Sequence, residues 1–546
     1  MNKVKISLVL LIIFSAYIFL FGIGKMALLD PDEPFYAETS REMLNRGEWL
    51  TPRIFSKPQF EKPPLYYWLT IVSFKTFGVN EFSARLPSAI FGILGIVGIY
   101  LLGGLLFSKK TALYAALVMA TAAEYVILAR ACVTDMVLCV LILYFFLFFF
   151  YAYLKENKKI YCILCSACLA LGVLTKGPVA LILPVFIVAL YLLLKKDLKA
   201  IFRFPMVTGA IVFFAISVPW YYLMYKTYGH DFISHFFGFQ NITRFLHPEH
   251  KIGDVFYYYI PVVLAGFLPW SIFLPCSAIE VIKRDKKEFK GHLFLLIWVA
   301  VFFIFFSVSR TKLPTYVFPL FPALALFVGR FWELKIARGV EGFDLGIVLS
   351  GILYALSLPI ALIVLYIISL KKYTELCPAI LILGIPLVLL YLISLALLLK
   401  RKMSLFFASI IITFAISVIP LSLYIAPKIS LYESSKDFAG YLVEHAKPGE
   451  RIGAETDYRR GIAFYLDNEG VIDVHNHDVI TKFLLLKERV WCVVKDKNHR
   501  LLYESIRKPY QHPTYVVNKF GKKVIITNNM PEDGKFIKKR SKYEPL

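Results

Sequence analysis

Long apolar segments are the feature that most constrains how this chain of 546 residues can fold. Segments of about 20 apolar residues recur up to residue 426, and each is long enough to cross a lipid bilayer. Hydrophobic residues make up 58% of the chain, well above the share found in soluble domains. We therefore predict an α-helical polytopic membrane protein. Its thirteen predicted spans are 4–26, 84–107, 111–130, 134–154, 159–174, 178–194, 205–226, 257–278, 292–309, 313–331, 344–369, 376–399 and 405–426.

The basic residues predict how the spans are oriented. The net charge of +23 comes from lysines and arginines that gather in short loops between alternate spans. Cytoplasmic loops carry such an excess, so we place these loops and the N-terminus in the cytoplasm. The same rule accounts for the basic charge without a nucleic-acid partner. The loop 27–83 and the residues after 428 then share the outer face.

The composition changes near residue 430, where apolar spans give way to shorter mixed runs. We predict a transmembrane domain over 1–428 and a small C-terminal α/β domain outside the membrane over 429–546. The segment 436–445 has a helical pattern, and 65–77 is predicted to be a helix lying at the membrane interface. The predicted β-runs are 451–455, 470–474, 489–494, 514–518 and 523–527.

The outer loop between the first two spans is unusually acidic for a membrane protein. Asp32 and Glu33 follow the first span, and Asp135 begins the fourth span on the same face. Aspartates at these positions can simply cap a helix or lie in a solvated turn. Charged groups at such depths more often serve a function, so Asp32 and Asp135 could bracket a reacting centre.

Cations on the outer face are candidates for binding an anionic lipid head group. Lys62, Arg244 and Lys312 lie there, and each taken singly could also be attracted to the membrane surface. His235, His247 and His250 lie in one outer loop, and with Glu61 or an aspartate they could bind Zn²⁺ or Mn²⁺, although no tight ligand spacing supports a metal site. The sequence has no phosphate-binding loop or dinucleotide fingerprint, so a soluble nucleotide donor is not indicated.

Residues 28–330 contain a series of distinctive short motifs. They are Asp30-Pro-Asp-Glu-Pro-Phe-Tyr-Ala-Glu, Phe60-Glu-Lys-Pro-Pro-Leu-Tyr-Tyr-Trp, Thr134-Asp-Met, Leu174-Thr-Lys-Gly-Pro, Arg244-Phe, Leu268-Pro-Trp and Lys312-Leu-Pro-Thr-Tyr. In sequence and in order, these motifs resemble those of the bacterial aminoarabinose transferases, which belong to the protein mannosyltransferase-like superfamily with the GT-C membrane fold.

The resemblance implies roles for individual residues. It makes Asp32 and Asp135 catalytic residues, and it implies a divalent metal held by Glu61 and His250. The residues that it assigns to the lipid phosphate and the donor are Lys62, Glu33, Arg244, Lys312 and Tyr316. The chain departs from the family at Gln240 and Asn241, where a Glu-His pair often stands, and this departure affects both the metal and the acceptor.

The resemblance also implies an activity, a location and partners. The implied enzyme is a monomeric glycosyltransferase of the bacterial inner membrane that acts at the periplasmic face. It would move a sugar from an undecaprenyl phosphate donor to lipid A or lipopolysaccharide by a single inverting displacement. The alternative is the same chemistry on a protein or another glycan. Two further alternatives, a flippase for lipid-linked sugars and a receptor built around the C-terminal domain, account less well for charges crowded on one face.

Overall fold

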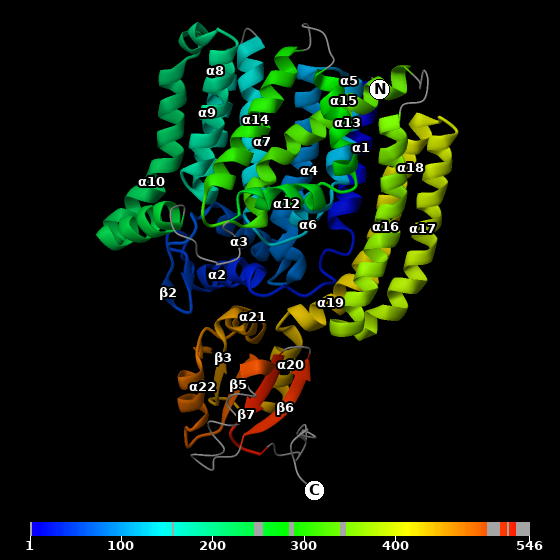
Figure 1. Ribbon diagram of the computed structural model, residues 1–546. Coiled ribbons are helices and arrows are strands. Elements are labelled where there is room, and N and C mark those ends of the chain that lie inside the picture. Colours follow the sequence, from blue (N-terminus) through cyan, green and yellow to red (C-terminus); the bar gives the residue numbers. More distant parts are fainter. Residues whose placement is uncertain are drawn as a thin grey trace.

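A computed structural model describes residues 3–154, 158–244, 255–282, 289–338, 345–498, 514–520 and 523–530. A bundle of long helices forms most of the molecule, and a small domain with a β-sheet lies against one end of the bundle (Figure 1). Helices α16–α18 stand at one side of the bundle, and α8–α10 stand at the other (Figure 1). This arrangement confirms the predicted fold class, a helical membrane protein with a small C-terminal α/β domain.

The predicted spans correspond to helices of the bundle. Within the described residues, nine helices are long and apolar enough to cross a membrane, and two bent helix pairs raise this number to 11. Two shorter apolar helices, Lys5–Leu20 and Val179–Leu194, occupy the remaining two predicted spans. The bundle helices are α1 (Lys3–Leu20), α4 (Glu81–Leu106), α5 (Lys109–Ala120), α6 (Ala123–Ala129), α7 (Asp135–Leu154), α8 (Lys158–Lys176), α9 (Val179–Leu194), α10 (Met206–Ile233), α12 (Tyr259–Gly266), α13 (Leu274–Ile282), α14 (Phe289–Val308), α15 (Phe321–Arg338), α16 (Leu345–Lys372), α17 (Cys377–Leu399) and α18 (Met403–Pro420).

Short irregular helices connect or extend several of these spans. The pair α5 and α6 bends by 67°, and the segment around α12 and α13 bends by 110°. A break leaves backbone N–H and C=O groups without partners in the helix. Within a membrane such a break is tolerated where neighbouring protein or water can hydrogen-bond these groups. The connecting helices are η1 (Leu198–Arg203), η2 (Ser234–Thr243), η4 (Phe256–Tyr258), η5 (Trp270–Phe273), η6 (Pro314–Leu320), η7 (Thr374–Leu376) and η8 (Leu421–Ile425).

Small residues and large aromatic residues together pack the bundle core. A Cβ atom added at Gly329 in α15 would lie 2.5 Å from the backbone nitrogen of Ala115 in α5, so only glycine allows these helices to approach so closely. Trp298 is fully buried, and its ring centre lies 4.5 Å from that of Phe146. Such close van der Waals packing is one of the main sources of helix association in a bilayer, where lipid removes the hydrophobic driving force.

The predicted outer loop forms helices that lie across one end of the bundle. They are α2 (Asp32–Arg46) and α3 (Leu65–Phe77), with the short strands β1 (Arg53–Ile54) and β2 (Lys57–Pro58) between them. Acidic residues in the first turn favour the start of α2, and Gly47 ends the helix in a left-handed conformation. Most of α2 is buried, so this polar helix is enclosed by protein rather than facing solvent.

The C-terminal domain has one mixed sheet of order β4-β3-β5-β7-β6. Strand β3 pairs in parallel with β4 and β5, and β7 pairs antiparallel with β5 and β6. The register places Arg451 opposite Val490 and Trp491 opposite Thr527. The elements are α19 (Ala426–Glu433), α20 (Lys436–His445), β3 (Arg451–Ala454), α21 (Thr456–Leu466), β4 (Ile472–Asp473), α22 (His477–Leu484), β5 (Val490–Lys495), β6 (Tyr515–Phe520) and β7 (Lys523–Thr527).

The five predicted β-runs and the helix at 436–445 are present, whereas α21 and α22 are helices that the sequence reading did not predict. The domain boundary predicted after residue 428 falls inside α19. Hydrogen bonds join the domain to the segment before α2: Tyr465 accepts from the Leu28 amide at 2.8 Å, and the Glu433 carbonyl accepts from the Asp30 amide at 3.0 Å. The outer loop and the C-terminal domain therefore lie together at one end of the bundle (Figure 1).

Candidate active site

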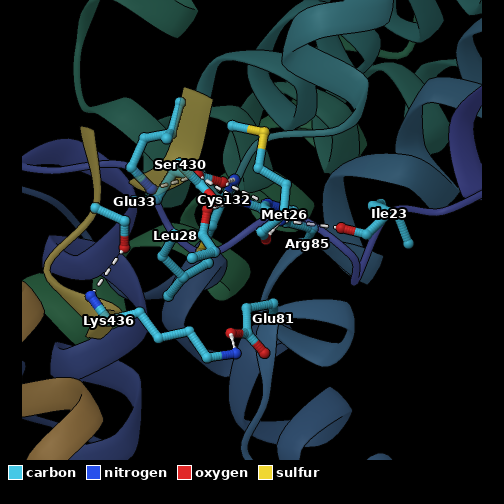
Figure 2. A network of polar contacts seen from close by, with 12 residues as sticks. Ile23, Met26, Leu28, Glu33, Glu81, Arg85, Cys132, Ser430 and Lys436 are labelled. Atoms are coloured by element: carbon cyan, nitrogen blue, oxygen red, sulfur yellow. Dashed lines mark hydrogen bonds and ion pairs between the residues drawn. The ribbon is translucent and has the colours of Figure 1, made fainter. Parts of the chain in front are cut away.

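A buried ion pair connects the elements that carry the candidate acidic residues. Arg85 in α4 pairs with Glu33 in α2 at 2.6 Å, and both side chains are almost inaccessible to solvent. Arg85 also donates to the carbonyl of Ile23 at 2.9 Å (Figure 2). It donates to the carbonyl of Ala27 at 2.9 Å as well. Glu33 accepts from the backbone amide of Cys132 at 2.9 Å. One ion pair thus fixes the end of the first span, the start of α2 and the turn before α7.

Asp32 is the first residue of α2 and directly precedes this anchor. Solvent reaches the residue, yet enough protein surrounds its carboxyl for desolvation to raise its pKa. Repulsion by Asp135 and Glu33 raises the pKa of Asp32 further, while attraction by Arg460 and Lys62 lowers it. Among the described residues, the Asp32 carboxylate has no hydrogen-bond partner, so it is available to a substrate.

Asp135 begins α7 and faces the same region from the bundle side. Its carboxylate pairs with Lys176, the last residue of α8, at 2.6 Å. The Lys176 ammonium also lies 5.1 Å from the centre of the Tyr316 ring. The carboxylate and the ring hold Lys176 in place, because a cation is attracted both to a carboxylate and to an aromatic face.

Lys62 lies in the segment between β2 and α3. The pKa of Lys62 is lowered to about 8; desolvation is the largest cause, and the charges of Lys176 and Arg244 act in the same direction. Glu61 and Asp135 oppose that shift. The ammonium donates to the Glu61 carbonyl at 3.3 Å. Three cations are therefore close enough to repel one another, and a bound anion would relieve that repulsion.

A cavity of about 530 Å³ opens beside these cations. Its polar lining includes Glu61, Lys62, Lys176, Gln240 and Arg244, and Gln240 accepts from Arg244 at 2.7 Å. The rest of the lining is mostly apolar and comes from α7, α9, α14 and η6. A site with a cationic end and an apolar body suits an amphiphile that has an anionic head and a hydrocarbon tail.

The predicted site residues fall into three groups. The structure brings together Asp32, Asp135, Lys62, Arg244, Tyr316 and Glu61 around the cavity and its cationic end. Glu33 is instead engaged by Arg85, and the buried Lys312 ammonium donates to the Ser309 carbonyl at 2.6 Å. Donor contacts by Glu33 and Lys312 stay predictions, while the structure makes Glu33 a positioning residue. His250 lies outside the described residues.

A metal site is not assembled by the part of the chain that the structure describes. No group of three or more His, Cys, Asp or Glu side chains there could hold a metal ion. Glu61 lines the cavity, but its predicted partner His250 lies outside the described residues. The described residues alone do not fit a metal, and binding through Glu61 and His250 stays a prediction.

Two residues near the site were not among the predicted site residues. Lys176 belongs to the Leu174-Thr-Lys-Gly-Pro motif, and that motif was the available signal. Arg460 belongs to α21 of the C-terminal domain and influences the pKa of Asp32. No local pattern marks Arg460, because it reaches Asp32 only through the docking of two distant segments.

The arrangement of helices defines the class of fold. The structure superposes on ArnT from Cupriavidus metallidurans, solved with undecaprenyl phosphate bound, with a TM-score of 0.78 at 23% identity. The match covers 95% of this chain and 98% of that chain. The archaeal oligosaccharyltransferase AglB from Archaeoglobus fulgidus matches with a TM-score of 0.51 at 14% identity, over 100% of this chain and 75% of that chain. The protein therefore has the membrane fold of the GT-C glycosyltransferases.

The sequence comparisons narrow this class. Residues 61–222 match a family described as dolichyl-phosphate-mannose-protein mannosyltransferase. The undecaprenyl phosphate-alpha-4-amino-4-deoxy-L-arabinose arabinosyl transferase of Yersinia enterocolitica is 32% identical over 59% of this chain and 58% of its own length. The enzyme of the same name from Erwinia tasmaniensis is 32% identical over 60% and 59%. These matches span less than two thirds of the relatives' length. They confirm the resemblance to the bacterial aminoarabinose transferases.

Proposed function

We propose that the protein is a glycosyltransferase that moves a sugar, of the aminoarabinose class, from undecaprenyl phosphate to lipid A or lipopolysaccharide. The observation that carries this proposal is the cavity with Lys62, Lys176 and Arg244 at one end and an apolar body. A polyprenyl phosphate has this polarity, because its charged phosphate is joined to a long hydrocarbon chain. The resemblance of the chain to aminoarabinose transferases supports the same donor.

A second apolar hollow supports a site for the donor's hydrocarbon chain. Leu183 and Phe305 line both this hollow and the cavity. The other lining residues come from α9 and α14, and all are apolar: Phe186, Leu190, Leu296, Ile297, Ala300, Val301 and Ile304. The hollow leads away from the three cations between α9 and α14, so a prenyl chain could follow it into the bilayer.

The chemistry begins with the bond between the anomeric carbon and the phosphate oxygen. As this bond breaks, negative charge develops on the departing polyprenyl phosphate. Lys62, Lys176 and Arg244 stabilise that charge, and electrostatic stabilisation of this kind is among the largest contributions to catalysis. Asp135 holds Lys176 in position at 2.6 Å. The donor brings its own leaving group, so no nucleotide is required.

The acceptor oxygen attacks the opposite face of the anomeric carbon, so the single displacement inverts its configuration. If that oxygen is a hydroxyl, Asp32 accepts its proton as a general base. If it belongs to a phosphate of lipid A, the acceptor is already anionic and Asp32 instead orients it or stabilises positive charge on the sugar. In both cases Asp32 acts from the exposed start of α2, on the side reached by the C-terminal domain.

The proposed activity also implies a cellular location and an oligomeric state for the protein. The basic loops support a multi-pass protein of the bacterial inner membrane with α2 and the C-terminal domain in the periplasm. There it would act as a monomer on substrates embedded in the lipid. A divalent cation at Glu61 and His250 stays a prediction from the sequence, and no step above depends on it.

A protein acceptor is the second candidate. It keeps the donor and the displacement but places the sugar on a hydroxyl side chain. The match of residues 61–222 to the protein mannosyltransferase family favours this alternative. A flippase is less well supported, because transporters place their charged binding groups near the bilayer midplane. Here the cations and carboxylates gather at one end of the bundle.

The deciding experiment is mass spectrometry of lipid A from cells that express the wild type, Asp32→Asn, or no protein. We expect a sugar-sized mass increment with the wild type, and at least about a 100-fold loss with Asp32→Asn, the size of general-base effects. Asp478→Asn is the matched control, since Asp478 is an exposed carboxylate in the first turn of α22. Unmodified lipid A together with a modified envelope protein would favour the second candidate. Full activity of Asp32→Asn would remove Asp32 from the mechanism.

A further inference from the structure

A cation of the C-terminal domain reaches the helix that carries Asp32. The guanidinium carbon of Arg460 in α21 lies 4.6 Å from the centre of the Phe35 ring in α2. Phe35 follows Asp32 by three residues in the same helix, and residues three apart lie on one helix face. Arg460 is therefore placed over the first turn of α2, on the face that bears Asp32.

The contacts on either side of Arg460 fix its position. A Cβ atom added at Gly461 would lie 2.2 Å from an Asp30 carboxylate oxygen, so α21 rests directly on the segment before α2. The Arg459 guanidinium lies 3.5 Å from the centre of the Phe55 ring. Further along, Arg46 pairs with Glu469 at 2.5 Å. Because α21 and the residues after it contact α2 and the segments on both sides of α2, the position of Arg460 over the first turn of α2 is fixed.

The Arg460 guanidinium nevertheless has no hydrogen-bond or ion-pair partner among the described residues. Neighbouring cations are engaged: Arg459 donates to the Val471 carbonyl at 2.7 Å, and Lys523 pairs with Asp30 at 3.0 Å. A guanidinium presents five N–H donors and binds carboxylate or phosphate in a two-pronged geometry. Arg460 is half-buried and held in place, and its donors remain available for an anion.

This cation is separate from the cationic end of the donor cavity. Lys62, Lys176 and Arg244 line the cavity, whereas Arg460 approaches from the C-terminal domain and is absent from the cavity lining. Asp32 is close to both groups, because the charges of both Arg460 and Lys62 act on its carboxyl. A displacement reaction needs separate sites for the leaving group and the acceptor.

We propose that Arg460 forms the acceptor subsite and binds a phosphate group of the acceptor lipid beside Asp32. The inference rests on the proposed function and deepens it, because it assigns the C-terminal domain a direct part in acceptor recognition. The step involves binding only, and no bond is made or broken by Arg460.

The test is lipid binding to the purified full-length protein in detergent, with lipid A carrying either two phosphates or one as the probes. The variants are Arg460→Met, which keeps an unbranched side chain against Phe35 without its charge, and Arg460→Lys, which keeps the charge. Arg451→Met is the matched control, because Arg451 is an exposed arginine of the same domain that pairs with Glu488. The KM values for acceptor and donor are measured on the same samples.

The wild type should prefer the bisphosphorylated lipid, and Arg460→Met should lose at least about tenfold of that affinity, the size of a lost charged hydrogen bond. The acceptor KM should rise in parallel while the donor KM stays constant, and Arg460→Lys should retain part of the effect. Unchanged lipid binding by Arg460→Met, or equal losses in Arg451→Met, would overturn the inference. Binding is measured without turnover, so a wild type that binds lipid A but transfers no sugar refutes only the proposed function.

Discussion

At the scale of single residues, the site combines a carboxylic acid, Asp32, and an amine, Lys62. Burial shifts the pKa values of these two groups in opposite directions. Desolvation raises the pKa of Asp32 and lowers that of Lys62 to about 8. The proposed reaction needs the charged form of both, a carboxylate at Asp32 and an ammonium at Lys62. Activity is therefore confined to the interval between the two pKa values, and it falls as either residue becomes neutral.

Lys62 sets the alkaline limit of this interval. As pH rises through about 8, Lys62 loses its proton, so kcat/KM for the donor should fall there rather than near 10.5, the usual pKa of lysine. Lys62→Arg keeps its charge at every accessible pH and should move this limit to higher pH. The measurement is the pH profile of donor kcat/KM for both proteins. A wild-type profile that stays flat to pH 10 would show that Lys62 does not bind the phosphate.

At the scale of elements, the Glu33–Arg85 pair decides where α2 begins relative to the bundle. Arg85 donates to backbone carbonyls at the end of the first span, and Glu33 accepts from the backbone of the turn before α7. Asp32 and Asp135 are neighbours of these anchored groups in the chain. The pair is thus responsible for the distance between the two predicted catalytic carboxylates.

We therefore expect Arg85→Met to lower the free energy of unfolding by about 3–5 kcal/mol, because it leaves the buried carboxylate of Glu33 without a counter-charge. The control is Lys436→Ala, which breaks the pair of Lys436 with Glu81 at the surface (Figure 2). Exposed pairs contribute about 1 kcal/mol or less, so this variant should unfold at nearly the wild-type temperature. Thermal unfolding in detergent compares the two, and equal stability of Arg85→Met and the wild type would contradict the anchoring role.

Substitutions at two glycines, one at the contact and one as a control, test how closely α21 must approach the bundle. Gly461→Ala should push α21 away from Asp30, since the added methyl group would lie far inside contact distance of its carboxylate. Gly440→Ala in α20 is the control, because nothing lies within 4 Å of a Cβ atom at that position. We expect transfer activity to fall about tenfold or more in the first variant and to be unchanged or slightly improved in the second, where alanine favours the helix. Activity assays at equal expression distinguish these outcomes.

At the scale of the whole molecule, a buried ion pair couples the C-terminal domain to the bundle. Lys523 in β7 pairs with Asp30 at 3.0 Å, and Ser435 donates to the same carboxylate at 2.6 Å. Burial raises the pKa of Asp30 to about 6 even though Lys523 lowers it. The ionised carboxylate is costly in this position, and Lys523 offsets part of the cost.

Lys523→Met should therefore loosen the domain, and the defect should depend on pH. Without Lys523 the pKa of Asp30 rises further, so its carboxylate destabilises the docked state more as pH increases through that value. Protonation at lower pH removes the unpaired charge and should restore docking. Limited proteolysis near residues 434–436, at pH 5 and pH 8, measures this difference. Equal cleavage at both pH values would argue against a role for Asp30 ionisation, and the double variant Asp30→Asn/Lys523→Met should show no pH dependence.

The sequence alone determined those features that depend on local patterns. Apolar length located the helices of the bundle, of which nine within the described residues, or 11 with the two bent pairs, are long and apolar enough to cross a membrane. Short β-rich runs separated by charged or turn residues located the five described strands of the C-terminal domain. Counting spans placed the outer loop and the C-terminal domain on one face, where they lie in contact. Motifs pointed to Asp32, Lys62 and Asp135, which the structure brings together. Each of these inferences depends only on residues that are close in sequence, or on whether the number of membrane spans between two segments is odd or even.

Only the tertiary structure decided which groups pair through space. Glu33 pairs with Arg85, and Asp135 pairs with Lys176. Lys523 pairs with Asp30, although almost the whole chain separates the two residues in sequence. Arg460 lies over α2 because α21, a helix with no predicted role, docks on it. Ion pairs and hydrogen bonds form between groups that are close in space, and those distances are set only when the chain folds. The sequence shows that a charged residue is present, whereas the packing of distant elements determines which group it pairs with.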